Sequence, residues 1–204
     1  MLKIFLQTYG CQMNKLDTAL VTSALQKAGF SLTEDPAQAD IILLNTCSVR
    51  KHAEEKVLSH LGHLKHIKET KPELIVGVMG CMAQRIGVQL LQHQAVDIVC
   101  GPGQIAQIVE LIKEASGKKE KKIAVTEKIR EAVTENKPLE DFETNFDAAD
   151  SHLPNQAFVS ITRGCNNFCS YCIVPYVRGP EVSRQPGVIL EQIKRLTQEG
   201  VKLL

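Results

Sequence analysis

The strongest constraint on the fold is a regular alternation of short apolar runs with amphipathic segments across residues 1–115. The apolar runs, which we interpret as strands, occupy residues 3–9, 40–45, 74–79 and 96–99. The run at 40–45 is apolar throughout, as in parallel strands that are covered on both faces. Each run precedes a segment with apolar residues at helical spacing, which predicts a helix after every strand. The pattern therefore predicts an α/β fold, an open parallel sheet with helices on both faces.

The first predicted helix carries clear local signals. Leu16 and Leu20 fall on one stripe of the helix. We interpret Asn14 and Asp17 as a capping pair near its start and Gly29 as its end. These signals predict a helix that packs one apolar face on the sheet.

A charged segment follows at residues 116–153. Between residues 116 and 150 there are seven Lys or Arg and nine Asp or Glu residues. Such a composition buries little apolar surface, which predicts a linker with one local strand or helix within residues 123–133.

A second domain is predicted for residues 154–204. It contains a strand at 157–162, a cysteine-rich loop, a helix that ends at Gly200, and the opening of another strand at 201–204. A single strand–helix unit has no partner strands, so we expect the sequence to be a fragment of a longer protein, with this segment as the truncated start of a β/α barrel.

Composition and cysteine number restrict the class of protein. Twenty-four Lys or Arg residues balance 23 Asp or Glu residues, so charge alone does not indicate a nucleic-acid binder. No apolar run approaches a membrane span, and the N-terminus does not resemble a secretory signal. We therefore expect a cytoplasmic protein without membrane contact. Seven cysteines in such a chain favour metal binding or catalysis over disulfides.

Three of the cysteines form a compact motif. Cys165, Cys169 and Cys172 have the spacing C-x3-C-x2-C directly after a predicted strand. Structural zinc sites use four protein ligands, whereas three clustered thiolates suit a [4Fe–4S] cluster with one open iron. Tyr171 lies between the last two cysteines, where its ring could pack against a bound cofactor. The motif predicts a metal centre at this loop.

Three further cysteines occupy equivalent positions. Cys11, Cys47 and Cys81 each fall one or two residues past the end of a predicted strand, and Cys47 and Cys81 immediately precede helices. The carboxyl ends of parallel strands converge on one crevice, so these thiols are predicted to form a second metal site. Gly10 and Gly80 would let the backbone approach a bulky ligand. Independent packing of the three cysteines is the alternative.

The remaining candidates are weaker. Cys100 ends the fourth predicted strand, and we expect it to be buried in the core, since free cysteine is commonly buried. Arg178 and Arg184 follow the cysteine loop and could bind phosphate or a cofactor carboxylate, with ordinary solvated surface as the alternative.

Four separated motifs resemble the radical S-adenosylmethionine methylthiotransferases. The motifs are residues 9–14 (YGCQMN), 45–50 (NTCSVR), 80–85 (GCMAQR) and 163–175 (RGCNNFCSYCIVP). Arg178-Gly179 and Glu181-x-Ser183-Arg184 continue the similarity. The resemblance covers both predicted domains and weakens in the charged segment.

The resemblance implies two [4Fe–4S] clusters with different tasks. The cluster on Cys165, Cys169 and Cys172 would bind S-adenosylmethionine and cleave it reductively to a radical. An auxiliary cluster, on the residues matching Cys11, Cys47 and Cys81, would present the sulfur that is methylated and inserted. Tyr171, Arg178 and Arg184 would be weaker cofactor contacts.

The resemblance also implies a substrate and partners. The motifs look most like the branch that converts isopentenyl-adenosine, beside the tRNA anticodon, to its 2-methylthio form. Threonylcarbamoyl-adenosine in tRNA and a ribosomal-protein aspartate are the alternative substrates. The implied partners are tRNA, an electron donor protein and a sulfur donor, with the main RNA-binding module beyond residue 204. The fragment alone is expected to be inactive.

Two other classes of function remain open on the sequence. One is a non-enzymatic metal-binding or redox-sensing module that holds zinc or a labile cluster. The other is a nucleotide-binding domain, which is the weaker alternative because no Gly-x-Gly-x-x-Gly follows the first predicted strand.

Overall fold

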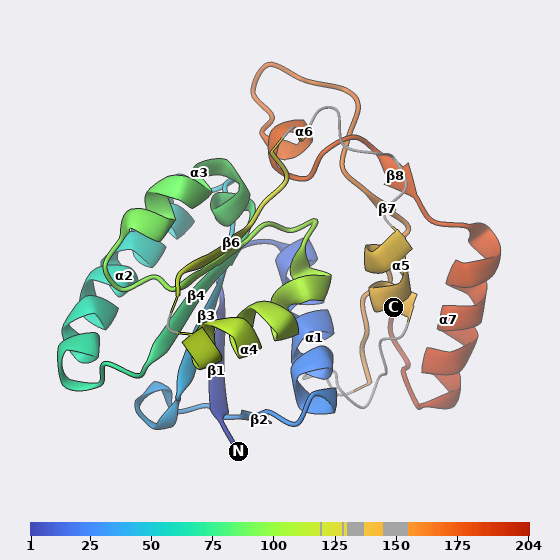
Figure 1. The fold of residues 1–204 in the computed structure, drawn as a ribbon. Helices are drawn as coiled ribbons and strands as arrows, with labels where there is room; N and C mark the ends of the chain where they lie inside the picture. The colour runs from blue at the N-terminus through green and yellow to red at the C-terminus, as the bar shows by residue number, and fades with distance from the viewer. Residues whose placement is uncertain (119, 128, 130–136, 145–154) are drawn as a thin grey trace.

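The main sheet contains six parallel strands in the order β2-β1-β3-β4-β5-β6 (Figure 1). This computed structural model describes residues 1–118, 120–127, 129, 137–144 and 155–204. The strands are β1 Lys3–Thr8, β2 Ser31–Leu32, β3 Ile41–Thr46, β4 Ile75–Gly80, β5 Ile98–Cys100 and β6 Lys122–Ala124. The predicted open parallel sheet is confirmed.

Helices cover both faces of this sheet (Figure 1). They are α1 Gln12–Lys27, α2 Lys51–Thr70, α3 Cys81–Gln92 and α4 Ile108–Lys118, with short 3-10 helices η1 Pro36–Gln38 and η2 Ile105–Gln107. Helices α1 and α4 share one buried cluster with the sheet, and α2 and α3 share the other. The arrangement is the doubly wound α/β fold that the alternation predicts.

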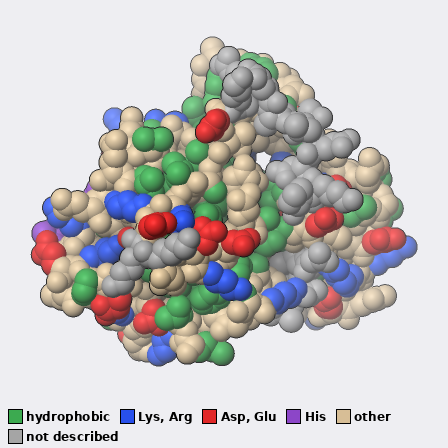
Figure 2. Space-filling model, in the orientation of Figure 1, with side chains coloured by type: hydrophobic (Ala, Val, Ile, Leu, Met, Phe, Trp, Pro, Cys, Tyr) green, Lys and Arg blue, Asp and Glu red, His purple; other side chains and the backbone are tan. Residues whose placement is uncertain are grey.

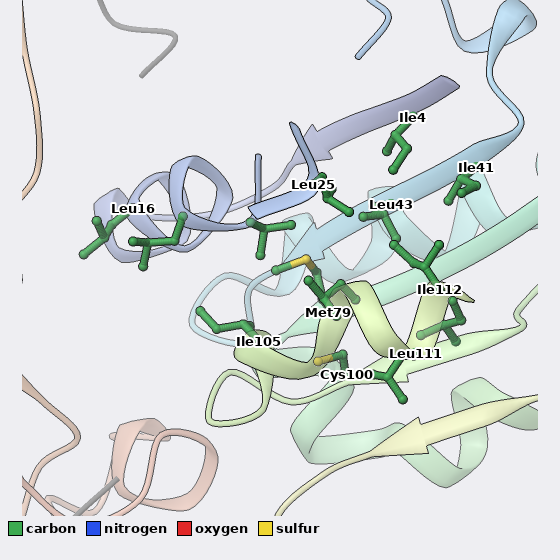
Figure 3. Close-up of a cluster of buried hydrophobic side chains, with 14 of the residues drawn as sticks. Ile4, Leu16, Leu25, Ile41, Leu43, Met79, Cys100, Ile105, Leu111 and Ile112 are labelled. Carbon is green, nitrogen blue, oxygen red and sulfur yellow. The ribbon is translucent and has the colours of Figure 1, made fainter. Parts of the chain in front are cut away.

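Strand β3 shows why its sequence is apolar without interruption. Ile41 and Leu43 belong to the cluster beneath α1 and α4, and Figure 3 shows both side chains there. Ile42 and Leu44 point to the opposite face and join the cluster beneath α2 and α3. Successive side chains of a strand alternate between faces, so a central strand that is covered on both faces must be apolar at every position.

Two strands extend the sheet beyond the four expected in residues 1–115. The short edge strand β2 pairs with β1, and β6 pairs with β5 through Val99 and Ile123. Strand β6 lies inside the charged segment, where we predicted a local strand or helix. It is part of the sheet and not of a linker, because its backbone hydrogen-bonds to β5 while its charged neighbours stay at the surface. Part of the 123–133 range lies outside the described residues.

The C-terminal segment differs from the prediction. Residues 157–162 were predicted to be a strand, but β7 covers only Thr162–Arg163 and pairs antiparallel with β8 Val182–Ser183. The predicted strand at 201–204 is reduced to an isolated bridge between Gln156 and Leu203. A strand needs a hydrogen-bonded neighbour along its length, and β8 is too short to pair with the predicted strand beyond Thr162.

Helices α6 Val174–Val177 and α7 Pro186–Gln198 belong to this segment. Helix α5 Lys137–Thr144 lies in the charged segment, beyond the 123–133 range in which a local strand or helix was predicted. Helix α7 confirms the predicted helix before Gly200. Leu139 of α5 and Leu196 of α7 join the buried cluster beneath α1 and α4. Figure 1 shows α5 between α1 and α7. The C-terminal segment therefore packs on the α1 side of the first domain.

The start of α1 corrects one local prediction. The helix begins after Cys11, and Asn14 forms a capping box with Cys11, whereas the predicted partner Asp17 takes no part in it. The Asn14 and Asp17 side chains are both fully buried. The Asp17 carboxylate accepts hydrogen bonds from Arg163 Nη1 at 2.8 Å and Arg178 Nη2 at 2.7 Å. Asp17 therefore connects α1 to the segment that carries the C-x3-C-x2-C loop.

The buried ion cluster extends to α5. Arg163 also donates to Glu143, and Glu143 lies near Arg184. Burial by itself would raise the pKa of Asp17, but the nearby Arg178 and Arg163 outweigh it and hold this pKa below its ordinary value. Burial raises the pKa of Glu143 against the opposing effect of Arg163. Asp17 is thus the carboxylate that the fold keeps ionised.

The packing of β3 generates a stability prediction. Leu43→Ala is expected to lower the free energy of unfolding by about 2–5 kcal/mol, because it leaves a cavity in a fully buried site. Leu58→Ala on the exposed face of α2 is the control and should change it by about 0.5 kcal/mol or less. Urea unfolding measures both. A loss below about 1 kcal/mol at Leu43 would contradict the packing described.

The Asp17 cluster generates a pH prediction. Asp17→Asn is expected to cost about 3–5 kcal/mol at pH 7, because two buried guanidinium groups lose their carboxylate. The lowered native pKa means that this stabilisation is present above the ordinary aspartate pKa of about 3.9 and is lost at lower pH. Urea unfolding between pH 7 and pH 3 should therefore show the difference from wild type shrinking below about pH 4.

Glu143→Gln is the matched control for that measurement. Because the pKa of Glu143 is raised, ionisation of this carboxyl is disfavoured in the native state, and its stabilising contribution falls as the pH rises through the native value. We expect Glu143→Gln to cost less at pH 7 than Asp17→Asn. Equal losses in the two variants would argue against Asp17 as the centre of the cluster.

Candidate metal centres

The sheet brings Cys11, Cys47 and Cys81 to one edge. Thr46 at the end of β3 pairs with Gly80 at the end of β4, so the cysteines that follow lie at the same level. Tyr9 donates its backbone N–H to Asn45 at 2.7 Å, which keeps β1 in step with β3 up to the residues before Cys11. This register is consistent with the prediction that the strand ends bring Cys11, Cys47 and Cys81 together.

The location of this edge within the sheet is equally informative. The order β2-β1-β3 means that the chain crosses to opposite sides of β1, which makes the gap between β1 and β3 the topological switch point. Ligands of open α/β sheets bind at the carboxyl ends of the strands beside such a gap. Cys11 and Cys47 end the two strands that border it, and Cys81 ends the next strand.

A buried pair of asparagines organises the same edge. Asn14 Nδ2 donates to Asn45 Oδ1 and to the Thr46 carbonyl, both at 2.9 Å. Asn45 Nδ2 donates to the Asn14 carbonyl at 2.8 Å, and Asn14 Oδ1 accepts from Cys11 Sγ at 3.2 Å. The two amides thereby fix the start of α1 to the end of β3, which sets where Cys11 lies relative to Cys47.

Two glycines allow the close approach of these backbones. A Cβ atom on Gly10 would lie 2.7 Å from both the Cys47 Cβ and Asn14 Oδ1. Gly80 has a φ of +95°, and a Cβ there would lie 2.5 Å from the Thr46 carbonyl oxygen. These distances are shorter than van der Waals contact, so only glycine fits at either position. The close neighbours are protein atoms, so the predicted approach of a bulky ligand to these glycines stays a prediction.

The helix positions of the cysteines differ from the prediction. Cys81 is the first residue of α3 and Cys11 is the N-cap of α1, whereas α2 begins four residues after Cys47, at Lys51. The Cys47 sulfur instead accepts a hydrogen bond from the Val49 N–H at 3.4 Å. Residues 48–50 form a loop because the chain must turn from β3 onto the face that α2 covers.

Cys81 and Cys100 have distinct surroundings. Burial raises the pKa of the Cys81 thiol, and the nearby Arg178 opposes that effect. Burial raises the pKa of Cys100 to about 12. Cys100 is fully buried among Met79, Ile105 and other apolar side chains, as Figure 3 shows. The expectation that Cys100 packs in the core is confirmed.

The second group of cysteines lies in a loop above the same end of the sheet. Figure 1 shows α6 and this loop at the end of the sheet away from the N-terminus, next to α3. Cys169 is exposed, and Cys165 and Cys172 are half-buried. The Cys172 N–H donates to the Cys169 carbonyl at 2.9 Å, and Cys165 N–H donates to Gly179 at 3.1 Å. These bonds give the loop a defined backbone with its thiols toward the surface.

The weaker predicted residues have different environments. Tyr171 is 90% exposed beside the cysteines. Arg178 and Arg184 are buried, and their guanidinium groups point inward, Arg178 to Asp17 and Arg184 to the Ser160 carbonyl and Gln192. The sequence did not predict that Asn45 would bond to Asn14, or that Arg163 would pair with Asp17. Arg163 and Asn45 nevertheless lie inside the motifs identified above.

The described residues fit thiolate-bound clusters in their donor chemistry. In the described ranges, no three His, Cys, Asp or Glu side chains form, as they stand, a group that could hold a metal ion. The strand-end donors are all sulfur, which suits iron–sulfur clusters and zinc. The buried Arg178 Nη1 makes no regular hydrogen bond to a described residue, so an anionic group beside Cys81 would complete its surroundings.

Two parts of the chain match known protein families. Residues 3–101 match the family described as "Uncharacterized protein family UPF0004", and residues 159–204 match the family described as "Radical SAM superfamily". No described helix is both long and apolar enough to cross a membrane.

Curated relatives match nearly the whole chain. A tRNA-2-methylthio-N(6)-dimethylallyladenosine synthase of Azobacteroides pseudotrichonymphae genomovar. CFP2 is 42% identical over 201 residues, which are 98% of this chain and 42% of the relative. The synthase of the same name from Bacteroides fragilis (strain YCH46) is 41% identical over 203 residues, with the same two shares. That of Syntrophotalea carbinolica is 38% identical over 207 residues, 99% of this chain and 44% of the relative.

The chain spans less than half the length of these relatives. The four cysteine motifs lie within the two matched ranges, and these relatives all carry the same name. The chain therefore belongs to the radical S-adenosylmethionine methylthiotransferase family, of which it holds the N-terminal UPF0004 domain and the start of the radical SAM domain.

Proposed function

We propose that the chain is the N-terminal part of an enzyme that methylthiolates carbon 2 of isopentenyl-adenosine beside the tRNA anticodon. The observation that carries the proposal is the convergence of two cysteine groups on one end of the sheet. Cys11, Cys47 and Cys81 end three strands there, and the C-x3-C-x2-C loop packs next to α3 above them. The relatives are named for this substrate, which supports it over threonylcarbamoyl-adenosine or a protein aspartate.

The residues have separate tasks in this proposal. Cys165, Cys169 and Cys172 would hold a [4Fe–4S] cluster, and the exposed Tyr171 would pack against S-adenosylmethionine bound beside it. Cys11, Cys47 and Cys81 would hold the auxiliary [4Fe–4S] cluster. When bound, the clusters supply reductive cleavage of S-adenosylmethionine and the sulfur for transfer. The protein orients both groups through the strand ends, the Asn14–Asn45 pair and the loop backbone.

The partners of the enzyme in this proposal are tRNA, an electron donor protein and a sulfur donor. Lys, Arg, Asp and Glu side chains are interspersed over the face that Figure 2 shows, and the described residues on that face form no large patch of one sign. Tight RNA binding needs clustered cations. We therefore propose that the main tRNA-binding module lies beyond residue 204. An electron donor protein and a sulfur donor would act on the enzyme in the cytoplasm, and the present chain alone would not turn over.

The two groups of cysteines should be separable by substitution in the full-length enzyme. Replacing Cys165, Cys169 and Cys172 with Ala is expected to remove about half of the iron and all reductive cleavage of S-adenosylmethionine. Replacing Cys11, Cys47 and Cys81 should remove a similar share of the iron, retain that cleavage and abolish sulfur transfer. Iron analysis, visible absorption and product chromatography measure these effects.

Cys100→Ala is the matched control, because Cys100 is buried in the apolar core. It should retain the iron of the wild type. Colourless, anaerobically purified protein that contains zinc would favour a non-enzymatic metal module instead. Full methylthiolation by the variant without Cys11, Cys47 and Cys81 would show that these residues do not hold the auxiliary cluster.

The substrate is tested by mass spectrometry of tRNA nucleosides from cells that lack the full-length gene. We expect loss of the 2-methylthio-isopentenyl nucleoside and accumulation of its unthiolated precursor. An unchanged level of that nucleoside would refute the substrate, and the threonylcarbamoyl nucleoside and the ribosomal aspartate would be examined next.

A further inference from the structure

The side chain of Arg178 extends from the C-terminal segment to the first domain. It follows Cys172 by six residues and lies directly after α6. Its side chain is 7% exposed, and its Nη2 donates to Asp17 of α1 at 2.7 Å. Helix α6, which precedes Arg178, packs beside α3, which begins at Cys81. Burial by itself would lower the pKa of Arg178, but the nearby Asp17 and Cys81 raise it. A residue from the C-x3-C-x2-C segment thus lies near a cysteine of the other group.

The charges around Arg178 do not balance within the described residues. The buried ion cluster contains three guanidinium groups, on Arg163, Arg178 and Arg184, and two carboxylates, on Asp17 and Glu143. Each guanidinium lies near a carboxylate, but the cluster keeps one net positive charge even when both acids are ionised. Buried cations are tolerated where they are paired with an anion.

An unpaired donor marks where that anion would lie. Arg178 Nη1 is buried and has no hydrogen-bond partner among the described residues. Arg163 Nη2 and Arg184 Nε of the same cluster are also without a hydrogen-bond partner there, but Arg178 directly follows α6, which packs beside α3 and its first residue, Cys81. The two Asp17 oxygens already accept hydrogen bonds from Arg163 Nη1 and Arg178 Nη2. A thiolate or cluster sulfide at the Cys81 end of the sheet is a negatively charged hydrogen-bond acceptor that would suit Nη1.

We propose that Arg178 is a positioning residue for the auxiliary cluster: held by Asp17, it donates toward the Cys81 side of that cluster and compensates its negative charge. This inference rests on the proposed function, since it requires that Cys81 is a cluster ligand. It differs from a contact with S-adenosylmethionine, because the guanidinium faces the first domain. The segment with the radical SAM cysteines would then tune the other cluster directly.

The test isolates the auxiliary cluster in the full-length protein. Cys165, Cys169 and Cys172 are replaced with Ala, so that the iron that remains reports on the auxiliary site. In this background the reduction potential is measured by potentiometric titration for Arg178→Gln and Arg178→Lys. A cation close to a cluster favours the reduced, more negative form, so Arg178→Gln is expected to shift the potential to a more negative value. Arg178→Lys, which keeps the charge, should stay closer to the parent.

Arg163→Gln is the matched control. Arg163 binds the same carboxylate, Asp17, but among the described residues it does not interact with a strand-end cysteine. A merely structural role of the ion cluster would affect both variants alike. We expect Arg163→Gln to leave the potential of the auxiliary cluster unchanged.

The outcomes distinguish this inference from the proposed function. Unchanged potential and iron content in Arg178→Gln, or an equal shift in Arg163→Gln, would overturn the role of Arg178 while leaving the cluster in place. Should Arg178→Gln lose its iron, retention of iron by Arg178→Lys and Arg163→Gln would support the role, and loss in all three would overturn it. A parent background without any cluster would refute the proposed function itself.

Discussion

Parallel pairing of β1, β3 and β4 is the constraint on which the candidate site depends. Because neighbouring parallel strands run in the same direction, their carboxyl ends form one edge, and the pairing of Thr46 with Gly80 sets Cys47 and Cys81 at one level. A slip of one residue would turn every side chain of a strand to the opposite face. The apolar side chains of β3 on both faces therefore fix the thiol positions as well as the core.

Buried polar groups refine what the sheet sets. The Asn14 and Asn45 amides are each bonded on two sides at the end of β3, where a missed hydrogen bond would be costly. The register pairs of β1 and β3 end at Thr8 and Asn45, and beyond this point the two amides connect the start of α1 to the end of β3. The sheet thus supplies the coarse convergence of the cysteines, and these amides together with Gly10 and Gly80 supply the short distances between the backbones.

Prediction from sequence succeeded where the information is local. The strand–helix alternation, the strand-end cysteines and the burial of Cys100 follow from patterns a few residues long. Asp17 was misjudged because an acidic residue near a helix start usually signals a cap, whereas its partners lie 146 and 161 residues away. The strands predicted at 157–162 and 201–204 failed for a related reason: an extended apolar run becomes a strand only beside a partner strand.

The long-range pairs of Asp17 make the two candidate metal centres interdependent. Arg163 and Arg178 lie on either side of the C-x3-C-x2-C loop, and both end on one carboxylate in α1. Movement of the loop away from the sheet would break two buried ion pairs at once, which is more costly than breaking surface pairs. Cys11 is the N-cap of α1, so the ion pairs of Asp17 connect the loop to the helix that follows this cysteine. The geometry therefore couples the positions of the two cysteine groups.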